Sequence, residues 1–174
     1  ALPEALRARV LIVGSFSKTY AMTGWRIGYA VGPEAWVREM IKVQSHSTSN
    51  PTSIAQKAAL EALTGPQESV VRMLQEYQRR REFLLAALNR IPGIRCVEPE
   101  GAFYVFPDVR ELMRARDIPA SKDLEVRLLE ECQIALTAGS AFGAEGYVRI
   151  SYAASQEVLQ EAVTRLDQFA RVGR

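Results

Sequence analysis

A lysine, two serines and an arginine stand close together near the beginning of the chain. Lys18 follows a short apolar run, residues 10–13, so it lies just past the end of an expected buried strand. Ser15 and Ser17 precede the lysine, and Arg26 follows it in the next stretch of sequence. Because α/β proteins bind ligands where their strands end, this stretch predicts one amine beside one anion-binding site.

An amine beside a phosphate pocket is the arrangement that a pyridoxal phosphate enzyme requires. In such an enzyme a lysine forms a Schiff base with the cofactor, and hydroxyl groups and a guanidinium bind its phosphate. We therefore predict that Lys18 is the catalytic, cofactor-binding amine and that Ser15, Ser17 and Arg26 bind the phosphate. Arg26 has apolar neighbours, so burying it is costly unless it meets that phosphate or a structural carboxylate.

The stretch around this lysine also resembles a family motif. Residues 15–29 read Ser-Phe-Ser-Lys-Thr-Tyr-Ala-Met-Thr-Gly-Trp-Arg-Ile-Gly-Tyr. This is similar to the cofactor-lysine motif of class I/II aminotransferases, the aspartate aminotransferase family. The resemblance implies an α/β chain of the fold-type I class of pyridoxal phosphate transferases. It extends over essentially all 174 residues.

Members of that family are longer and carry most of the cofactor domain before this lysine. The chain therefore resembles their C-terminal half, and the partner of the pyridine nitrogen and the ring-stacking aromatic are expected outside it. Residues 1–75 are expected to be the end of the large cofactor domain and the start of the interdomain helix. Residues 76–174 are expected to be the small α/β domain.

A second arginine is expected to bind the substrate. Arg149 lies at the centre of a predicted strand, 147–152, and no sequence neighbour offers a carboxylate to pair with it. By resemblance, Arg149 binds the α-carboxylate of the substrate through two parallel hydrogen bonds; the alternative is a structural ion pair. Phe103 lies in a predicted strand, 101–106, that is similar to a family strand leading to the substrate. It is either a substrate contact or a core aromatic.

Periodicity and turn residues predict the elements that position these groups. The segment 45–51 is polar and is expected to be a loop, with His46 solvated or catalytic. By resemblance this loop approaches the neighbouring subunit of a homodimer, and residues 47–50 are candidates for contacts there. Strands are expected over 10–14, 26–31, 94–97, 101–106, 134–137 and 147–152. Helices are expected from Pro33, over 53–63 after the cap Thr52, over 67–91, from Ser121 and after the cap Ser155. The side chains expected to face the core from these helices include Trp36, Met40, Ile54, Ala58, Leu63, Val70, Leu74, Tyr77, Leu84 and Leu88.

Composition excludes several classes of protein. A net charge of +2 gives no reason to expect nucleic acid or an anionic membrane as partner, and the arginines at 79–81 lack interleaved aromatics. No apolar run approaches the length of a bilayer span, and the N-terminal residues are not those of a signal peptide. Cys96 and Cys132 lack CxxC spacing, which favours a reduced cytoplasmic protein. No metal site is expected.

The predicted reaction is transamination between an amino acid and a 2-oxo acid. Residues 43–56 resemble the bacterial aspartate-type subgroup, which makes aspartate with 2-oxoglutarate the leading pair. An aromatic aminotransferase or a C–S lyase on the same scaffold is the close alternative, and a fragment inactive in isolation is another. A nucleotide-binding P-loop is disfavoured, because that motif needs glycine directly before its lysine and Ser17 stands there.

Overall fold

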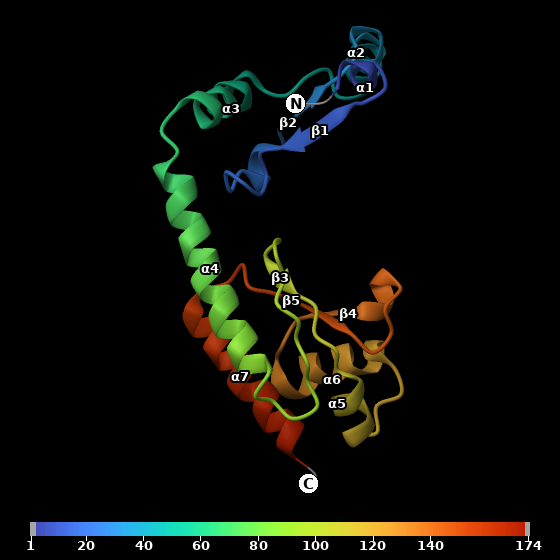
Figure 1. The fold of residues 1–174 in the computed structure, drawn as a ribbon, viewed down its shortest axis with the longest axis vertical. Helices are drawn as coiled ribbons and strands as arrows, with labels where there is room; N and C mark the ends of the chain where they lie inside the picture. Colours follow the sequence, from blue (N-terminus) through green and yellow to red (C-terminus); the bar gives the residue numbers. More distant parts are fainter. Residues whose placement is uncertain (1–2, 173–174) are drawn as a thin grey trace. The chain divides into compact units, whose positions relative to one another are not determined.

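The computed structural model describes residues 3–172, which form a mixed α/β structure (Figure 1). The chain divides into two compact units, Ala1–Arg72 and Met73–Arg174. The long helix α4, Glu68–Leu88, contains the boundary between them. The assignment of 1–75 to a large cofactor domain and of 76–174 to a small domain stays a prediction.

The first unit is built on a two-stranded antiparallel ribbon. Strands β1 and β2 pair from Ile12 opposite Val31 to Ser15 opposite Gly28. Glycine is required at position 28, because a Cβ there would lie 2.6 Å from the carbonyl oxygen of Gly14. The elements of this unit are α1 (Glu4–Arg7), β1 (Ile12–Ser15), η1 (Thr23–Trp25), β2 (Gly28–Val31), α2 (Glu34–Ser47) and α3 (Ser53–Thr64).

The core of the first unit forms on the small-residue face of α3. Ala55 and Ala59 are buried there, and Thr52 caps the helix by accepting a hydrogen bond from the Ala55 N–H, as predicted. The prediction that Ile54 and Leu63 face inward is wrong, since they are 72% and 58% exposed. The alanines let the neighbouring chain approach closely, and the larger side chains are left on the outer face.

Other expectations for this unit also need correction. The first strand is not buried: Ile12 is 49% and Val13 73% exposed, because no second layer covers the ribbon within the described residues. Trp36 and Met40 are likewise exposed. The second strand begins at Gly28 and excludes Arg26. Helix α2 runs to Ser47, so His46 lies in its last turn and not in a loop, because no helix-breaking residue precedes Pro51.

The second unit contains a three-stranded antiparallel sheet with β5 in the middle, in the order β3-β5-β4. The helix predicted over 67–91 is present but ends at Leu88. The helices from Ser121 and after Ser155 are confirmed, and the Ser155 hydroxyl accepts the Val158 N–H at 3.4 Å. The strand predicted at 94–97 is wrong; only Arg95 forms an isolated bridge, to Asp108. The elements are α4, β3 (Tyr104–Val105), α5 (Arg110–Ala115), α6 (Ser121–Cys132), β4 (Thr137–Ala138), η2 (Gly139–Phe142), β5 (Val148–Ser151) and α7 (Gln156–Arg171).

One apolar core fixes the second unit. It includes Leu84 and Leu88 from the stripe predicted on α4, whereas Leu74 of that stripe is 66% exposed. Helices α6 and α7 and strands β3 and β5 supply Leu124, Leu128, Leu159, Leu166, Phe169, Val105 and Val148. Among the described residues, no helix is both long enough and apolar enough to cross a membrane.

Two leucines on α6 give a matched test of this core. Leu124 is fully buried and Leu129 is 54% exposed. We expect Leu124→Ala to lower the free energy of unfolding by about 2–5 kcal/mol, because it leaves a cavity. We expect Leu129→Ala to change it by less than about 0.5–1 kcal/mol. Chemical denaturation followed by circular dichroism measures both, and equal losses would contradict this description of the core.

Candidate functional site

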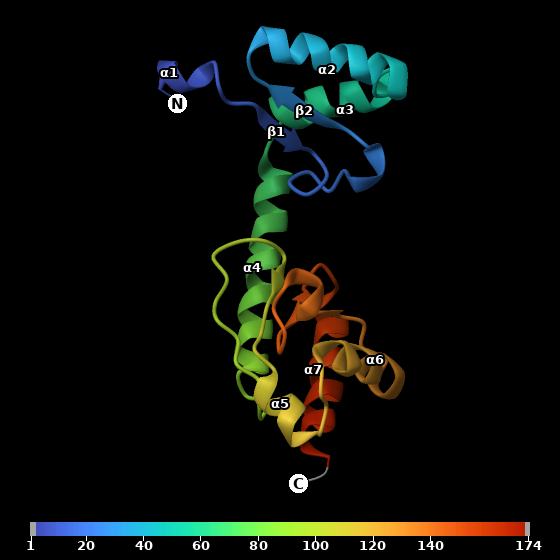
Figure 2. The ribbon, with the colours of Figure 1, turned by 90° about the vertical axis from the view of Figure 1, so that its right-hand side faces the viewer.

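The candidate cofactor residues stand at one end of the β1–β2 ribbon. Residues 16–27 connect the two strands, and the Phe16 N–H donates to the Ile27 carbonyl at 3.4 Å, just beyond the last strand pair. Figure 2 shows this connection leaving β1 and returning to β2 at the same end of the ribbon. Antiparallel pairing therefore brings Ser15, at the end of β1, and Arg26, just before β2, to the same end.

Apolar anchors hold this connection in place. Phe16, Met22 and Ile27 are buried against α3, and the Phe16 ring lies 5.7 Å from the Tyr20 ring centroid. The segment between the anchors turns on itself, with the Ala21 N–H donating to the Lys18 carbonyl at 3.2 Å. Lys18 is exposed on this turn. The sequence thus alternates buried apolar anchors with polar residues that are exposed or half-buried.

Ser15 organises the start of the connection. Its Oγ accepts a hydrogen bond from the Ser17 N–H at 3.1 Å, which leaves the hydroxyl proton of Ser15 to be donated elsewhere. Gly14 precedes it because a Cβ at that position would lie 2.3 Å from the ring of Tyr29. Ser17 is half-buried and also brings a hydroxyl to this end of the ribbon.

Arg26 carries an accessible guanidinium. Its backbone is left-handed, with φ 51°, and its Nη1 donates to the Thr23 carbonyl at 3.0 Å. No carboxylate among the described residues pairs with it, and the side chain is exposed rather than buried. It lines a cavity of about 700 Å³ together with Gln44, Thr48 and Asn50. The structure thus brings Arg26 and three residues of the predicted 45–51 loop, Thr48, Asn50 and Pro51, to one cavity.

The donor set at this ribbon end fits the phosphate and aldehyde of pyridoxal phosphate. The stretch 15–26 contains one lysine, one arginine and no carboxylate, so its charged side chains are all cationic. Two serine hydroxyls and most of the arginine N–H groups can donate to phosphate oxygens, and the amine can react with an aldehyde. The roles of Ser15, Ser17, Lys18 and Arg26 nevertheless remain predictions.

Arg149 lies in the second unit, in the middle of β5, and is half-buried. Its Nη2 is 3.4 Å from the Thr137 Oγ1, on the strand residue directly opposite. Its Cζ lies 4.7 Å from the centroid of the Phe142 ring and 5.5 Å from that of Tyr104. Among the described residues no carboxylate pairs with it, so the structure does not show the ion pair considered as the alternative role.

These neighbours of Arg149 were missed by sequence reasoning. Thr137 could have been found from the sequence, because β4 and β5 are consecutive strands joined by one short connection. Pairing them as antiparallel neighbours places Thr137 opposite Arg149. Phe142 and Tyr104 come from different segments, and nothing in their spacing indicates that they meet one guanidinium. Phe103 packs against the main core and its carbonyl accepts the Tyr152 N–H at 2.9 Å, which gives it a structural role; a substrate contact stays a prediction.

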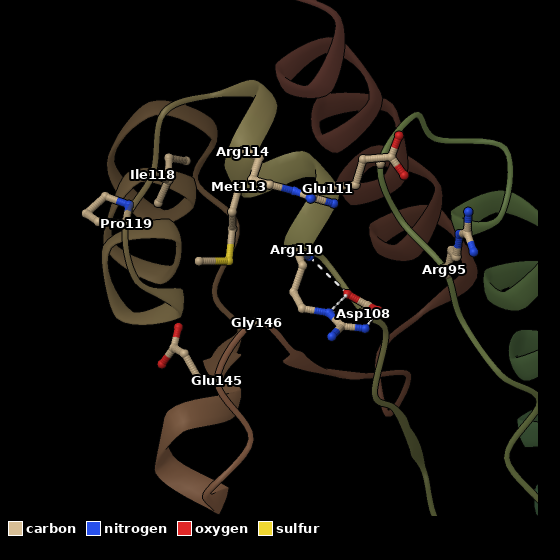
Figure 3. Close-up of a pocket in the computed structure, with 11 residues that line it drawn as sticks. Arg95, Asp108, Arg110, Glu111, Met113, Arg114, Ile118, Pro119, Glu145 and Gly146 are labelled. Carbon is tan, nitrogen blue, oxygen red and sulfur yellow. Dashed lines mark hydrogen bonds and ion pairs between the residues drawn. The ribbon is translucent and has the colours of Figure 1, made fainter.

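Another cavity, of about 600 Å³, lies in the second unit and contains none of the predicted site residues (Figure 3). The pair Asp108–Arg110 lies on its wall, with the Arg110 Nε 3.0 Å and 3.1 Å from the two carboxylate oxygens. The hydrogen bond from Arg110 holds the pKa of the Asp108 carboxyl below its usual value of 3.8. Charges of both signs line this cavity, so we do not assign it the chemistry of the ribbon end.

The Asp108 pair predicts a pH dependence of stability. The pKa of the Asp108 carboxyl is lower in the folded state than its unfolded value near 3.8. Its ionised form therefore stabilises the fold above that pH, and this stabilisation is lost as the pH falls toward the folded-state pKa. We expect Asp108→Asn to be less stable than the unmodified chain at pH 6, with the difference shrinking below about pH 4. Urea denaturation across pH 2.5–7 measures this. Asp117→Asn, at an exposed residue, is the matched substitution for comparison. A constant difference for Asp108→Asn across the pH range would contradict the assignment.

Known proteins resemble this chain over almost its whole length. The sequence model described as "Aminotransferase class I and II" matches residues 3–166. An aspartate aminotransferase of Geobacillus stearothermophilus is 46% identical over 168 residues, which are 97% of this chain and 43% of that protein. An aspartate/prephenate aminotransferase of Nitrosomonas europaea is 48% identical over 167 residues, which are 92% of this chain and 42% of that protein.

Solved structures agree with these relatives. The crystal structure of an aspartate aminotransferase from Rhizobium meliloti superposes with a TM-score of 0.91 at 42% identity, covering 97% of this chain and 43% of that one. An aromatic aminotransferase from Pyrococcus horikoshii gives 0.87 at 39% identity, covering 95% and 44%. The chain therefore spans less than half the length of the proteins that it matches.

Proposed function

The chain belongs to the class I and II aminotransferase family, and from that premise we propose that it serves pyridoxal-phosphate-dependent transamination between an amino acid and a 2-oxo acid. The observation that carries the proposal is the end of the β1–β2 ribbon. One amine, two hydroxyls and a guanidinium with no carboxylate partner among the described residues are grouped there. When bound, pyridoxal phosphate supplies an aldehyde that condenses with amines and a ring that withdraws electrons.

The residues of the ribbon end have separate tasks in this proposal. Ser15, Ser17 and Arg26 bind the phosphate, which fixes the orientation of the cofactor ring. Lys18 holds the cofactor through its Nζ in the resting enzyme. With the cofactor bound, the Lys18 Nζ would accept the proton from the substrate Cα and later donate it, as general base and then acid.

Arg149 orients the substrate in this proposal. Its guanidinium has no carboxylate partner among the described residues, so two of its N–H groups are available to the α-carboxylate of an amino acid. The Thr137 hydroxyl, 3.4 Å from Nη2, occupies one edge of the group. A flat, two-point contact of this kind fixes both the distance and the plane of the carboxylate.

We propose aspartate with 2-oxoglutarate as the substrate pair, supported by relatives of 46% identity that bear the name aspartate aminotransferase. Prephenate is a second candidate acceptor, because a relative of 48% identity is named an aspartate/prephenate aminotransferase. The likeness to an aromatic aminotransferase keeps an aromatic donor as the alternative.

We also propose that the enzyme is a cytoplasmic homodimer. Apolar side chains on β1, α2 and α3 are exposed, and a second subunit or the further segments that the relatives possess would cover them; the residues are Ile12, Val13, Trp36, Ile41, Val43, Ile54 and Leu63. Cys96 and Cys132 are free, and burial raises the pKa of the Cys96 thiol to about 11, which agrees with a reducing compartment.

The test of this function uses the complete polypeptide that carries this sequence, loaded with pyridoxal phosphate. We expect a visible absorption band that bleaches when aspartate is added. Lys18→Ala should lose the band and lower the rate by about 10²–10⁴-fold, because it removes both the attachment point and the proton acceptor.

Arg149→Lys should raise the KM for aspartate by about 10–100-fold, since lysine offers no bidentate contact.

Lys57→Ala, at an exposed lysine of α3, is the matched control and should leave the spectrum and the rate unchanged. A band that responds to another amino acid but not to aspartate would change the assigned amino donor and leave the proposed mechanism intact. Absence of any band that depends on Lys18 would contradict the proposed function.

A further inference from the structure

Two aromatic rings flank the guanidinium of Arg149. The Cζ atom lies 4.7 Å from the Phe142 ring centroid and 5.5 Å from that of Tyr104. Phe142 is 50% exposed and Tyr104 37% exposed, so neither ring is explained by burial in the core. A ring at this distance attracts the cation through its face without neutralising the positive charge.

The Phe142 ring is itself supported from behind. Its edge meets Phe106, with the centroids 6.0 Å apart and the planes at 80°. Phe106 stacks on Tyr147 at 5.4 Å and 10°, and the Arg110 guanidinium covers Tyr147 at 5.6 Å. We call Phe142, Phe106 and Tyr147 the aromatic column. One end of the aromatic column lies against Arg149 and the other end against Arg110. The Arg110 side chain is in turn hydrogen-bonded to Asp108.

The backbone also fixes where Phe142 stands. It is the last residue of the 3-10 turn η2, which ends at Gly143 with a left-handed φ of 73°. The Gly139 N–H donates to the Tyr147 carbonyl at 2.7 Å, tying the start of η2 to the chain that leads into β5. A Cβ on Gly139 would lie 2.2 Å from the Ala144 carbonyl oxygen, so this close approach requires glycine.

We propose that Phe142, supported by the aromatic column, is a positioning residue that holds the Arg149 guanidinium in the plane needed to bind the substrate carboxylate. The inference rests on the proposed function and adds a residue that this function did not assign. A cation–π contact places no hydrogen-bond acceptor on the guanidinium, so its N–H groups stay available for a bidentate contact. A carboxylate in the place of the ring would instead occupy those N–H groups and compete with the substrate.

The kinetic test replaces the ring in the complete, cofactor-loaded enzyme. Phe142→Leu should raise the KM for aspartate and for 2-oxoglutarate by about tenfold with little change in kcat, because only the carboxylate contact is loosened. Phe142→Tyr keeps the ring and should restore the KM. Phe106→Leu should change KM in the same direction by less. Phe83→Leu, at a half-buried aromatic of α4 outside the column, should leave KM unchanged.

A chemical labelling experiment measures the accessibility of the Arg149 guanidinium and does not depend on enzyme activity. Phenylglyoxal modifies accessible arginines, and peptide mass spectrometry gives the rate at Arg149 alone. We expect Phe142→Leu to label Arg149 several-fold faster than the unmodified enzyme, and Phe142→Tyr to label it at the unmodified rate. If Phe142→Leu does not fold, Tyr104→Leu removes the second ring near Arg149 and should produce the same two changes.

The outcomes separate this inference from the proposed function. An unmodified enzyme that fails to transaminate would overturn the function, while the labelling rates would still report whether the rings hold Arg149. An active enzyme in which Phe142→Leu changes neither KM nor labelling would overturn the positioning role alone. Equal effects of Phe142→Leu and Phe142→Tyr would also overturn it, because the ring would then not be the cause.

Discussion

The antiparallel pairing of β1 with β2 is the constraint on which the candidate cofactor site depends. Because Ser15 pairs with Gly28, everything between them must turn back within one connection, and Ser15 and Arg26 come to the same end of the ribbon. The turn is held by Phe16, Met22 and Ile27 on α3, and not by the polar residues. The polar groups are therefore not needed to hold the turn, which agrees with the ligand-binding role that we propose for them.

Arg26 and Arg149 are among the arginines for which no carboxylate partner stands within the described residues. Within the described residues, Arg26 bonds to a backbone carbonyl, and Arg149 bonds to a threonine hydroxyl and lies close to two aromatic rings. In both cases the positive charge is held in place but not neutralised. These two arginines are therefore the ones for which we propose an anionic ligand as the partner.

Local chemistry was predicted from the sequence more successfully than burial. The caps Thr52 and Ser155 were correct, because a cap depends on a few neighbouring residues. The burial of Ile54 and Leu63 was wrong, since α3 has two apolar faces and only its packing partner decides which one is covered. The grouping of Ser15, Ser17, Lys18 and Arg26 came from a contiguous motif, whereas the rings around Arg149 depend on strand register and the turn η2, which spacing alone does not reveal.

The most direct test of the account is to locate the cofactor chemically. The polypeptide that carries this sequence is saturated with pyridoxal phosphate, reduced with borohydride to make the attachment permanent, digested and mapped by mass spectrometry. The sequence contains four lysines, Lys18, Lys42, Lys57 and Lys122. The account predicts the added pyridoxyl mass on Lys18 alone among them. The same mass on the other three at comparable yield, or no stable attachment to Lys18, would contradict it.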